Sequence, residues 1–262
     1  MPLFYNLCSS SKGNASYLGS LTGGILFDAG VGLRSFQRSL NLAGLSPEAV
    51  QAVVISHEHS DHISGLMAIT QKYNLPVYAS RGTLSYLLEH GILHPEQQMH
   101  VLDRPTEIAG MEVTPFATSH DSRESLGFRV TLENGRIASI CTDLGIVTDE
   151  VDSALRGSDF LMLESNYDEE MLRDGSYPYF LKRRIASPRG HLSNRQSGST
   201  IARMIESGCS HFVLAHLSQE NNRPELAMGE VVDILSERDL LLGRDYLLDV
   251  LPPRNDGLTF EL

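Results

Sequence analysis

The stretch that decides the fold reads Ser56-His57-Glu58-His59-Ser60-Asp61-His62, and it holds four metal-binding side chains within six residues. It follows the apolar, β-branched run 52–55, which is typical of a buried parallel strand. Apolar residues at helical spacing follow at 63–69. The pattern predicts a strand-to-helix turn at the carboxyl end of a strand, where open α/β sheets place their sites.

The spacing of these side chains suits two neighbouring metal ions better than one. His57 and His59 are two residues apart in extended chain, so their side chains point the same way. Asp61 and His62 lie one turn further on and can face a second ion. A lone histidine here would more often be a buried structural residue. Four ligand side chains directly after a buried strand instead indicate a metal site with two ions.

Length and composition are those of an ordinary soluble protein. The chain has 262 residues, with 41% hydrophobic and 21% charged. No apolar run approaches the roughly 20 residues that span a bilayer, and residues 1–5 lack the features of a signal peptide. Three widely spaced cysteines predict buried free thiols in a reducing compartment. We therefore expect a cytoplasmic protein with no membrane partner.

The net charge of −12 is not typical of a protein that coats nucleic acid. The chain stays acidic even with two divalent ions bound. A polyanionic substrate must then be attracted by the metal ions and by a local basic patch. The sequence leaves the oligomeric state open, a homodimer included.

The order of the predicted elements indicates two packed sheets. Apolar runs predict strands at 3–8, 16–21, 24–28, 52–55, 76–79, 111–116, 126–132, 136–142, 159–163, 211–215 and 246–250. Helical patterns occupy 32–43, 62–73, 81–90, 148–156, 194–207 and 225–237. The strands form two clusters, each mixed with helices, and neither a repeat nor a linker separates them. This predicts one α/β (α+β) domain over residues 1–262, an αββα sandwich of two mixed sheets with helices on both outer faces.

Three further candidate ligands each follow an apolar strand: His120, Asp143 and His216. Any one of them alone would be an ordinary polar loop residue. Their shared position at strand ends favours a common site, because a two-metal centre needs ligands from several strands. The other histidines lack this setting, and we interpret them as structural or surface residues: His90, His94, His100 and His211.

These motifs together resemble the metallo-β-lactamase fold superfamily of metal-dependent hydrolases. The resemblance implies that Asp28, in the run 25–30, supports the ligands from behind. It implies one ion held by His57, His59 and His120, a second held by Asp61, His62 and His216, and Asp143 as the bridge between them. Mixed imidazole and carboxylate ligands suit two divalent ions of Zn, Mn or Fe.

Three residues indicate phosphodiester chemistry. Asp143 stands where thiol-ligated β-lactamases have cysteine, which favours phosphodiester hydrolases. Glu164 and His191 resemble, in their order, the proton-donating pair of tRNA 3′-processing endonucleases of this fold. Glu164 could instead cap a turn, and His191 could be a loop residue before a helix. A helix start disfavours the imidazolium by about 0.3–1 kcal/mol, but a neighbouring carboxylate favours it more strongly.

Five runs resemble the YycJ/WalJ-like subgroup, which has been described as DNA exonucleases: 9–14, 163–168, 181–185, 190–194 and 214–222. The interval from Asp143 to His216 is too short for the inserted domain of the β-CASP nucleases. The resemblance implies a DNA end as substrate and a hydroxide between two ions as nucleophile, which Asp61 helps to orient. His191 with Glu164 would protonate the leaving oxygen. The alternatives are a small-molecule phosphodiesterase or thioester hydrolase of the same fold, and a metal-stabilised binding module without catalysis.

The segment 177–190 contains aromatic and basic residues and no acidic one. Tyr179, Lys182, Arg183 and Arg184 are its candidate substrate contacts, because aromatics stack on bases and cations meet phosphates. The alternative is the solvated face of a helix that packs its aromatics inward. Its place in the chain between Glu164 and His191 favours substrate contact. The Gly-containing turn at 9–14 either lines the site or only reverses the chain, and the sequence does not decide.

Overall fold

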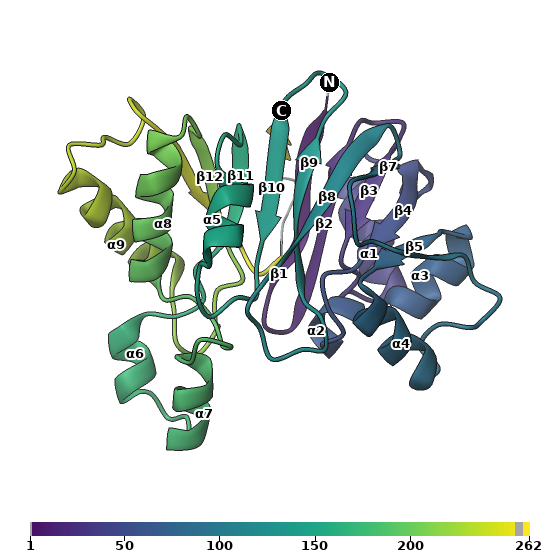
Figure 1. Ribbon diagram of the computed structural model, residues 1–262, viewed down its shortest axis with the longest axis horizontal. Coiled ribbons are helices and arrows are strands. Elements are labelled where there is room, and N and C mark those ends of the chain that lie inside the picture. The colour runs from purple at the N-terminus through teal and green to yellow at the C-terminus, as the bar shows by residue number, and fades with distance from the viewer. Residues whose placement is uncertain (1, 255–258) are drawn as a thin grey trace.

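The computed structural model describes residues 2–254 and 259–262. Two seven-stranded sheets pack face to face, and helices cover the outer face of each sheet (Figure 1). The predicted αββα sandwich is confirmed. Both chain ends lie at one end of the sandwich, and α2 (Ser60–Ile63), α6 (Glu169–Asp174) and α7 (Tyr179–Ile185) lie at the opposite end.

The first sheet has the order β14-β1-β2-β3-β4-β5-β6. Its strands are β14 (Thr259–Glu261), β1 (Leu3–Ser10), β2 (Gly13–Gly19), β3 (Gly24–Phe27), β4 (Val50–Val54), β5 (Val77–Ala79) and β6 (Met99–Val101). Strands β3 to β6 are parallel. Its outer face packs against α1 (Leu33–Leu42), α3 (Leu66–Tyr73) and α4 (Arg81–Glu89) in one apolar cluster.

The second sheet has the order β13-β12-β11-β10-β9-β8-β7. Its strands are β13 (Leu247–Val250), β12 (His211–Ala215), β11 (Phe160–Glu164), β10 (Ile137–Cys141), β9 (Leu126–Thr131), β8 (Met111–Ala117) and β7 (Thr106–Ile108). Strands β10 to β13 are parallel. Helices α5 (Asp149–Leu155), α8 (Asn194–Glu206) and α9 (Pro224–Ser236) cover its outer face in a separate apolar cluster.

Aromatic side chains fill the space between the sheets. The rings of Phe27 and Phe128 lie 5.3 Å apart, and those of Phe4 and Phe160 lie 4.9 Å apart. All four side chains belong to the cluster between the sheets and are almost fully buried. Central strands such as β11 are therefore apolar on both faces, which explains why the sequence shows uninterrupted apolar runs rather than alternation.

The predicted helix 62–73 is wrong in one respect, because the chain forms two helices, α2 and α3, separated at Ser64 and Gly65. A Cβ atom on Gly65 would lie 1.8 Å from the Val31 carbonyl oxygen, so the backbone passes too close to its neighbour for a side chain. The sequence also misses β6, β7 and β14, which have three residues each, and α6. A short 3-10 turn, Pro47–Ala49, follows the expected start at Ser46.

The three cysteines are buried free thiols, as predicted. Burial raises the pKa of Cys209 to about 12. Across residues 2–254 and 259–262, none of the helices is long and apolar enough to cross a membrane.

Candidate metal centre

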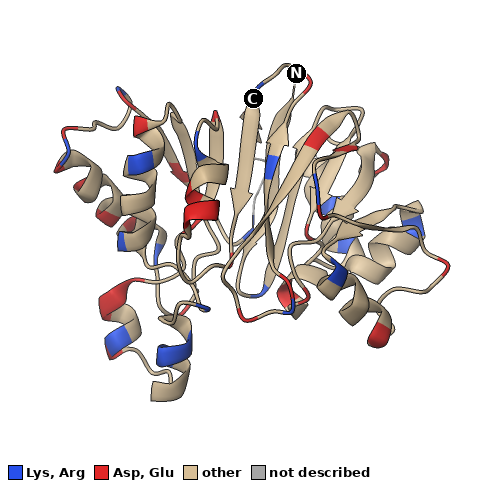
Figure 2. Ribbon diagram, in the orientation of Figure 1, with Lys and Arg blue, Asp and Glu red and all other residues tan. Residues whose placement is uncertain are grey.

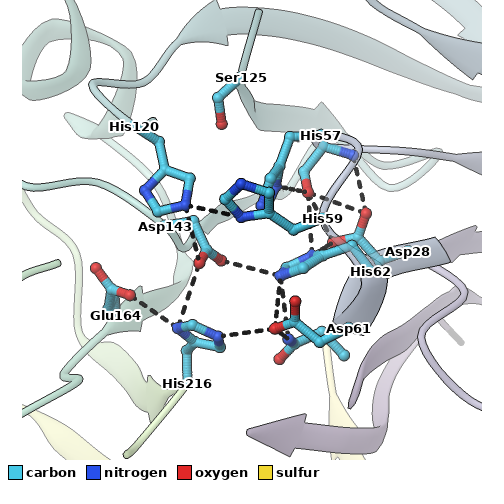
Figure 3. A network of polar contacts seen from close by, with 12 residues as sticks. Asp28, His57, His59, Asp61, His62, His120, Ser125, Asp143, Glu164 and His216 are labelled. Carbon is cyan, nitrogen blue, oxygen red and sulfur yellow. Dashed lines mark hydrogen bonds and ion pairs between the residues drawn. The ribbon is translucent and has the colours of Figure 1, made fainter. Parts of the chain in front are cut away.

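The site lies where parallel strands of both sheets end. Asp28 follows β3, His57 follows β4, Asp143 follows β10, Glu164 ends β11 and His216 follows β12. Because the carboxyl ends of these strands meet at one end of the sandwich, their side chains converge from both sheets (Figure 3). His120, in the turn after β8, joins them there.

Ligand atoms of the seven predicted metal residues come together in overlapping groups, in each of which the atoms lie within 4.8 Å of one another. The groups are His57, His59 and His120; Asp61, His62 and His216; and His57, His62 and Asp143. The first two are the sets that the family resemblance implies for separate ions. Asp143 adjoins both sets, since its Oδ1 lies 3.8 Å from Nε2 of His120 and its Oδ2 lies 3.3 Å from Nε2 of His62.

Asp28 holds the run Ser56 to His62 in place. Its Oδ2 lies 2.8 Å from Nδ1 of His62, and its carboxylate also accepts hydrogen bonds from the backbone and hydroxyl of Ser56. Because the Ser56 hydroxyl donates to Asp28, it accepts from Nδ1 of His57 at 3.0 Å. Both imidazoles are thus fixed through Nδ1 and present Nε2 to the site. This is the supporting role predicted for Asp28.

The remaining buried histidines are oriented in the same way. Nδ1 of His120 donates to the Gly190 carbonyl at 3.0 Å, and Nδ1 of His216 donates to Oε1 of Glu164 at 2.9 Å. A carbonyl or carboxylate oxygen can only accept, so both rings carry hydrogen on Nδ1. Their Nε2 atoms remain available, which is how metal-binding imidazoles are usually held in proteins.

Divalent metal ions fit this donor set. Nε2 of His57 is buried and has no hydrogen-bond partner among the described residues, whereas Nε2 of His216 lies 3.5 Å from Oδ2 of Asp61. Burial, followed by the charge of His62, lowers the pKa of His57 well below its ordinary value, so this ring is neutral and keeps a free lone pair. An unpaired buried nitrogen is unfavourable unless a ligand satisfies it.

The carboxylate of Asp143 is ionised at the centre of the cluster. Burial favours the neutral acid, but the charges of His216 and His62 outweigh burial and hold the pKa of Asp143 well below its usual range. The reciprocal effect acts on His216, where burial disfavours the cation. Asp143 outweighs it, with Asp61 and Glu164, and raises the pKa of His216 to about 10. An ionised carboxylate among buried imidazoles is the donor expected between two cations.

Three of these residues have left-handed backbone conformations. The φ angles are 59° at Asp28, 60° at Asp143 and 55° at His216. Such conformations are uncommon for residues other than glycine and cost about 1–3 kcal/mol each. All three lie just after a strand, where the turn aims the side chain into the site. Sequence patterns gave no signal of this strain.

Glu164 and His191 form the predicted pair. Glu164 is fully buried, and its Oε1 lies 2.8 Å from Nδ1 of His191. Burial alone would raise the pKa of Glu164, but His191 outweighs burial and lowers it. The other oxygen accepts from the backbone amides of Leu144 and Leu192 at 3.2 and 3.0 Å, so Glu164 caps these turns and contacts His191 as well. His191 has 20% of its side chain exposed and lies at the edge of the cluster.

Two asparagines complete the site, and the sequence did not predict either. Nδ2 of Asn14 lies 3.2 Å from Oδ2 of Asp61 and 3.1 Å from Nε2 of His62, so the turn at 9–14 lines the site. Nδ2 of Asn166 donates to the His216 carbonyl at 2.8 Å and helps to hold its unusual backbone. Both asparagines fall within runs that resemble the YycJ/WalJ-like subgroup, and this resemblance is the signal by which the sequence could have identified them.

Helix α7 presents its aromatics to solvent. Tyr179 is 76% exposed and Phe180 is 73% exposed, so the alternative in which the aromatics pack inward is wrong. The guanidinium of Arg183 lies over the Tyr179 ring, and Lys182 donates to the carbonyl of Arg173. Figure 2 shows the basic residues of α7 at the end of the molecule opposite the chain termini.

Arg184 connects α7 to the metal cluster. Its guanidinium donates to Oδ2 of Asp121, and Oδ1 of Asp121 lies 3.4 Å from Nε2 of His120 and 3.8 Å from Nε2 of His59. The charge of Arg184 is thus partly neutralised by Asp121, so Arg184 is less available to a phosphate than an unpaired arginine would be. Asp121 is an acidic neighbour of the site that the sequence did not single out.

The four histidines interpreted as structural or surface residues lie outside every ligand group found among the described residues. Two of them stack on tyrosine rings, His90 on Tyr86 and His100 on Tyr78. The interpretation of these residues is confirmed.

Comparisons with known proteins agree with this geometry. Residues 24–217 match the family model described as Beta-lactamase superfamily domain. Exodeoxyribonuclease YycJ of Bacillus anthracis is 35% identical over 254 residues, which cover 96% of each chain. Exodeoxyribonuclease WalJ of Streptococcus pneumoniae is 32% identical over 97% of this chain and 96% of that protein.

The fold is also found in a solved structure. The metallo-β-lactamase fold protein YhfI from Bacillus subtilis superposes with a TM-score of 0.73, with 16% identity over 99% of each chain. The chain therefore belongs to the YycJ/WalJ-like group of the metallo-β-lactamase superfamily of metal-dependent hydrolases.

Proposed function

We propose that this protein is a dinuclear phosphodiester hydrolase that degrades DNA from an end. The observation that carries the proposal is the second ligand group, Asp61, His62 and His216, beside the first, with an ionised carboxylate adjoining both. The names of the relatives, exodeoxyribonucleases YycJ and WalJ, support DNA as the substrate. Both sheets supply site residues, so we propose that residues 1–262 act as one hydrolase domain.

The seven predicted ligands would hold two divalent ions of Zn, Mn or Fe, one in each group, with Asp143 between them. When bound, the ions supply Lewis acidity, which activates a water molecule and stabilises charge on the phosphoryl oxygens. Asp61 is 19% exposed and contacts Nδ2 of Asn14, so it faces the open side of the cluster. From there its carboxylate can accept a hydrogen bond from the attacking water and orient it.

His191 would act as the general acid. Glu164 accepts from its Nδ1 and holds the ring, which leaves Nε2 as the atom that would give a proton to the leaving oxygen. Because Oε1 of Glu164 also accepts from His216, one buried carboxylate would position both the acid and a metal ligand. Glu164 therefore acts through the two histidines as a positioning residue.

The DNA strand would approach over α7. Exposed Tyr179 can stack on an unpaired base, and Lys182 and Arg183 offer cations to phosphates. Arg184, paired with Asp121, would contribute less unless the substrate displaces that carboxylate.

The test compares three substrates with the protein loaded separately with Zn²⁺, Mn²⁺ or Fe²⁺. They are an end-labelled linear duplex, bis(p-nitrophenyl) phosphate and a thioester. Release of nucleotides from the duplex end would support the proposal. Turnover of only the small phosphodiester or only the thioester would assign the alternative hydrolases, and stoichiometric metal without any turnover would indicate a binding module.

The variant His191→Ala distinguishes the proposed general acid from the metal ligands. His191→Ala should keep its metal content but slow DNA hydrolysis by roughly 10²–10⁴-fold. The loss should be much smaller with bis(p-nitrophenyl) phosphate, because p-nitrophenolate leaves without a proton. His100→Ala is the matched control, since His100 stacks on Tyr78 outside the cluster. Equal rates for His191→Ala and wild type on DNA would refute the assigned role.

A further inference from the structure

A basic pocket lies beside the metal centre. It has a volume of about 480 Å³, within the range of small-molecule sites, and α1, the β1–β2 hairpin and residues 253–254 line it. Three cations surround it, Lys12, Arg38 and Arg254, and its described lining includes no carboxylate. Four other pockets on the described surface each include at least one carboxylate.

The charge of this pocket is unusual for the chain. The sequence has 33 acidic residues against 21 basic ones, yet the described carboxylates form no ion pair with any of the three cations. Arg184, by contrast, is paired with Asp121. Unpaired cations around a concave surface create a local positive potential that a net acidic protein otherwise lacks.

Hydroxyl groups add hydrogen-bond donors to the cations. Ser10, Ser35, Ser39 and Ser64 line the pocket. Arg38 lies one turn after Ser35 on α1, so both reach the pocket from one face of the helix. Guanidinium, ammonium and hydroxyl groups together are the donors that bind a phosphate group.

The pocket and the metal centre share a wall. Gly30 lines the pocket, and a Cβ atom placed there would lie 1.6 Å from the backbone oxygen of Asp61. Ser10 also lines the pocket and is hydrogen-bonded to Asn14, whose side chain reaches Asp61 and His62. The pocket therefore adjoins the Asp61 side of the cluster.

We propose that this pocket binds a phosphate group of the substrate strand and so positions that strand at the metal centre. The inference rests on the proposed function, because it takes a nucleic acid strand as the substrate. The phosphate is either the terminal phosphate of the strand or one of its internal phosphates. The chemistry is the same for both, and the test distinguishes them.

The test measures binding without hydrolysis. The probe is a short single strand with phosphorothioate linkages and a 3′ fluorophore, made with either a 5′-phosphate or a 5′-hydroxyl, and binding to the full-length protein is followed by fluorescence anisotropy. Arg38→Ala and Lys12→Ala should each raise Kd about 5-fold and lower the log–log salt slope by about 0.7. Arg34→Ala is the control, since Arg34 is exposed on the same helix and is not among the pocket residues.

Loss of affinity only with the 5′-phosphorylated probe would assign the terminal phosphate, and equal loss with both probes would assign an internal phosphate. Unchanged affinity in both pocket variants, or the same loss in Arg34→Ala, would overturn the proposal. If the pocket variants weaken binding but the wild-type protein hydrolyses no DNA with any metal, the phosphate site stands and the proposed nuclease function fails.

Discussion

Replacing Glu164 with glutamine tests whether its four hydrogen bonds stabilise the fold and the metal site. Glu164 is fully buried and accepts four hydrogen bonds, two on each oxygen. All four partners are donors. A glutamine side chain of the same shape has one acceptor oxygen and one NH₂ group, so two of the four donors lose their partner.

The magnitude follows from those two donors. A buried donor left unpaired costs about 1–3 kcal/mol, so we expect Glu164→Gln to lower the free energy of unfolding by about 3 kcal/mol. With a urea m-value of about 3 kcal/mol/M, the unfolding midpoint falls by about 1 M. Because His216 also loses the carboxylate that orients it, metal affinity should fall roughly 10–100-fold.

Urea unfolding of the metal-free protein measures the first effect, and titration with a chromophoric zinc chelator as competitor measures the second. Glu112→Gln is the matched control, because Glu112 is exposed on β8, and its unfolding free energy should stay within about 0.5 kcal/mol of wild type. If Glu164→Gln unfolds at the wild-type midpoint and binds metal with wild-type affinity, the four-donor argument is refuted.

Three other outcomes are expected. Gly30→Ala should lower metal occupancy and destabilise the fold by about 2 kcal/mol or more, because its methyl group would collide with the Asp61 carbonyl. The control Gly32→Ala places its methyl group in open space and should be neutral, so equal behaviour of the two variants would contradict the close approach. Removing metal with EDTA should lower the unfolding free energy, by about 2.7 kcal/mol if the free metal had been at 100 times its Kd, and an unchanged thermal midpoint would argue against bound metal. Cys209 has its pKa raised to about 12 and stays protonated at pH 8, so Ellman's reagent at that pH should react with it only after unfolding. Rapid reaction of Cys209 in the native protein would contradict its burial.

Local patterns in the sequence were enough to predict the ligands. His57 to His62 lie within six residues of the chain, and each remaining candidate lies at most three residues after an apolar strand, so their position could be predicted without coordinates. Two of the ligand groups found among the described residues are the sets implied by the resemblance. The αββα architecture was equally accessible, because strands buried on both faces leave long apolar runs.

Short and mixed-character elements were not predictable in the same way. Strands β6, β7 and β14 have three residues each, too few for a periodic signal. The break between α2 and α3 depends on how close Gly65 comes to Val31, which lies far away in the sequence. Helix α7 carries aromatics that a sequence pattern would assign equally well to a core or to an exposed surface.

The sequence by itself indicated which side chains come together and that they lie near strand ends, because residue type and apolar periodicity are local properties. Only the tertiary structure decided that Glu164 orients two histidines at once, that Asn14 reaches the site from the β1–β2 hairpin, and that three cations without an ion pair to any described carboxylate surround one pocket beside it. These relationships join residues tens to hundreds of positions apart. Packing of the two sheets brings them together, and no local pattern encodes which distant side chains will meet.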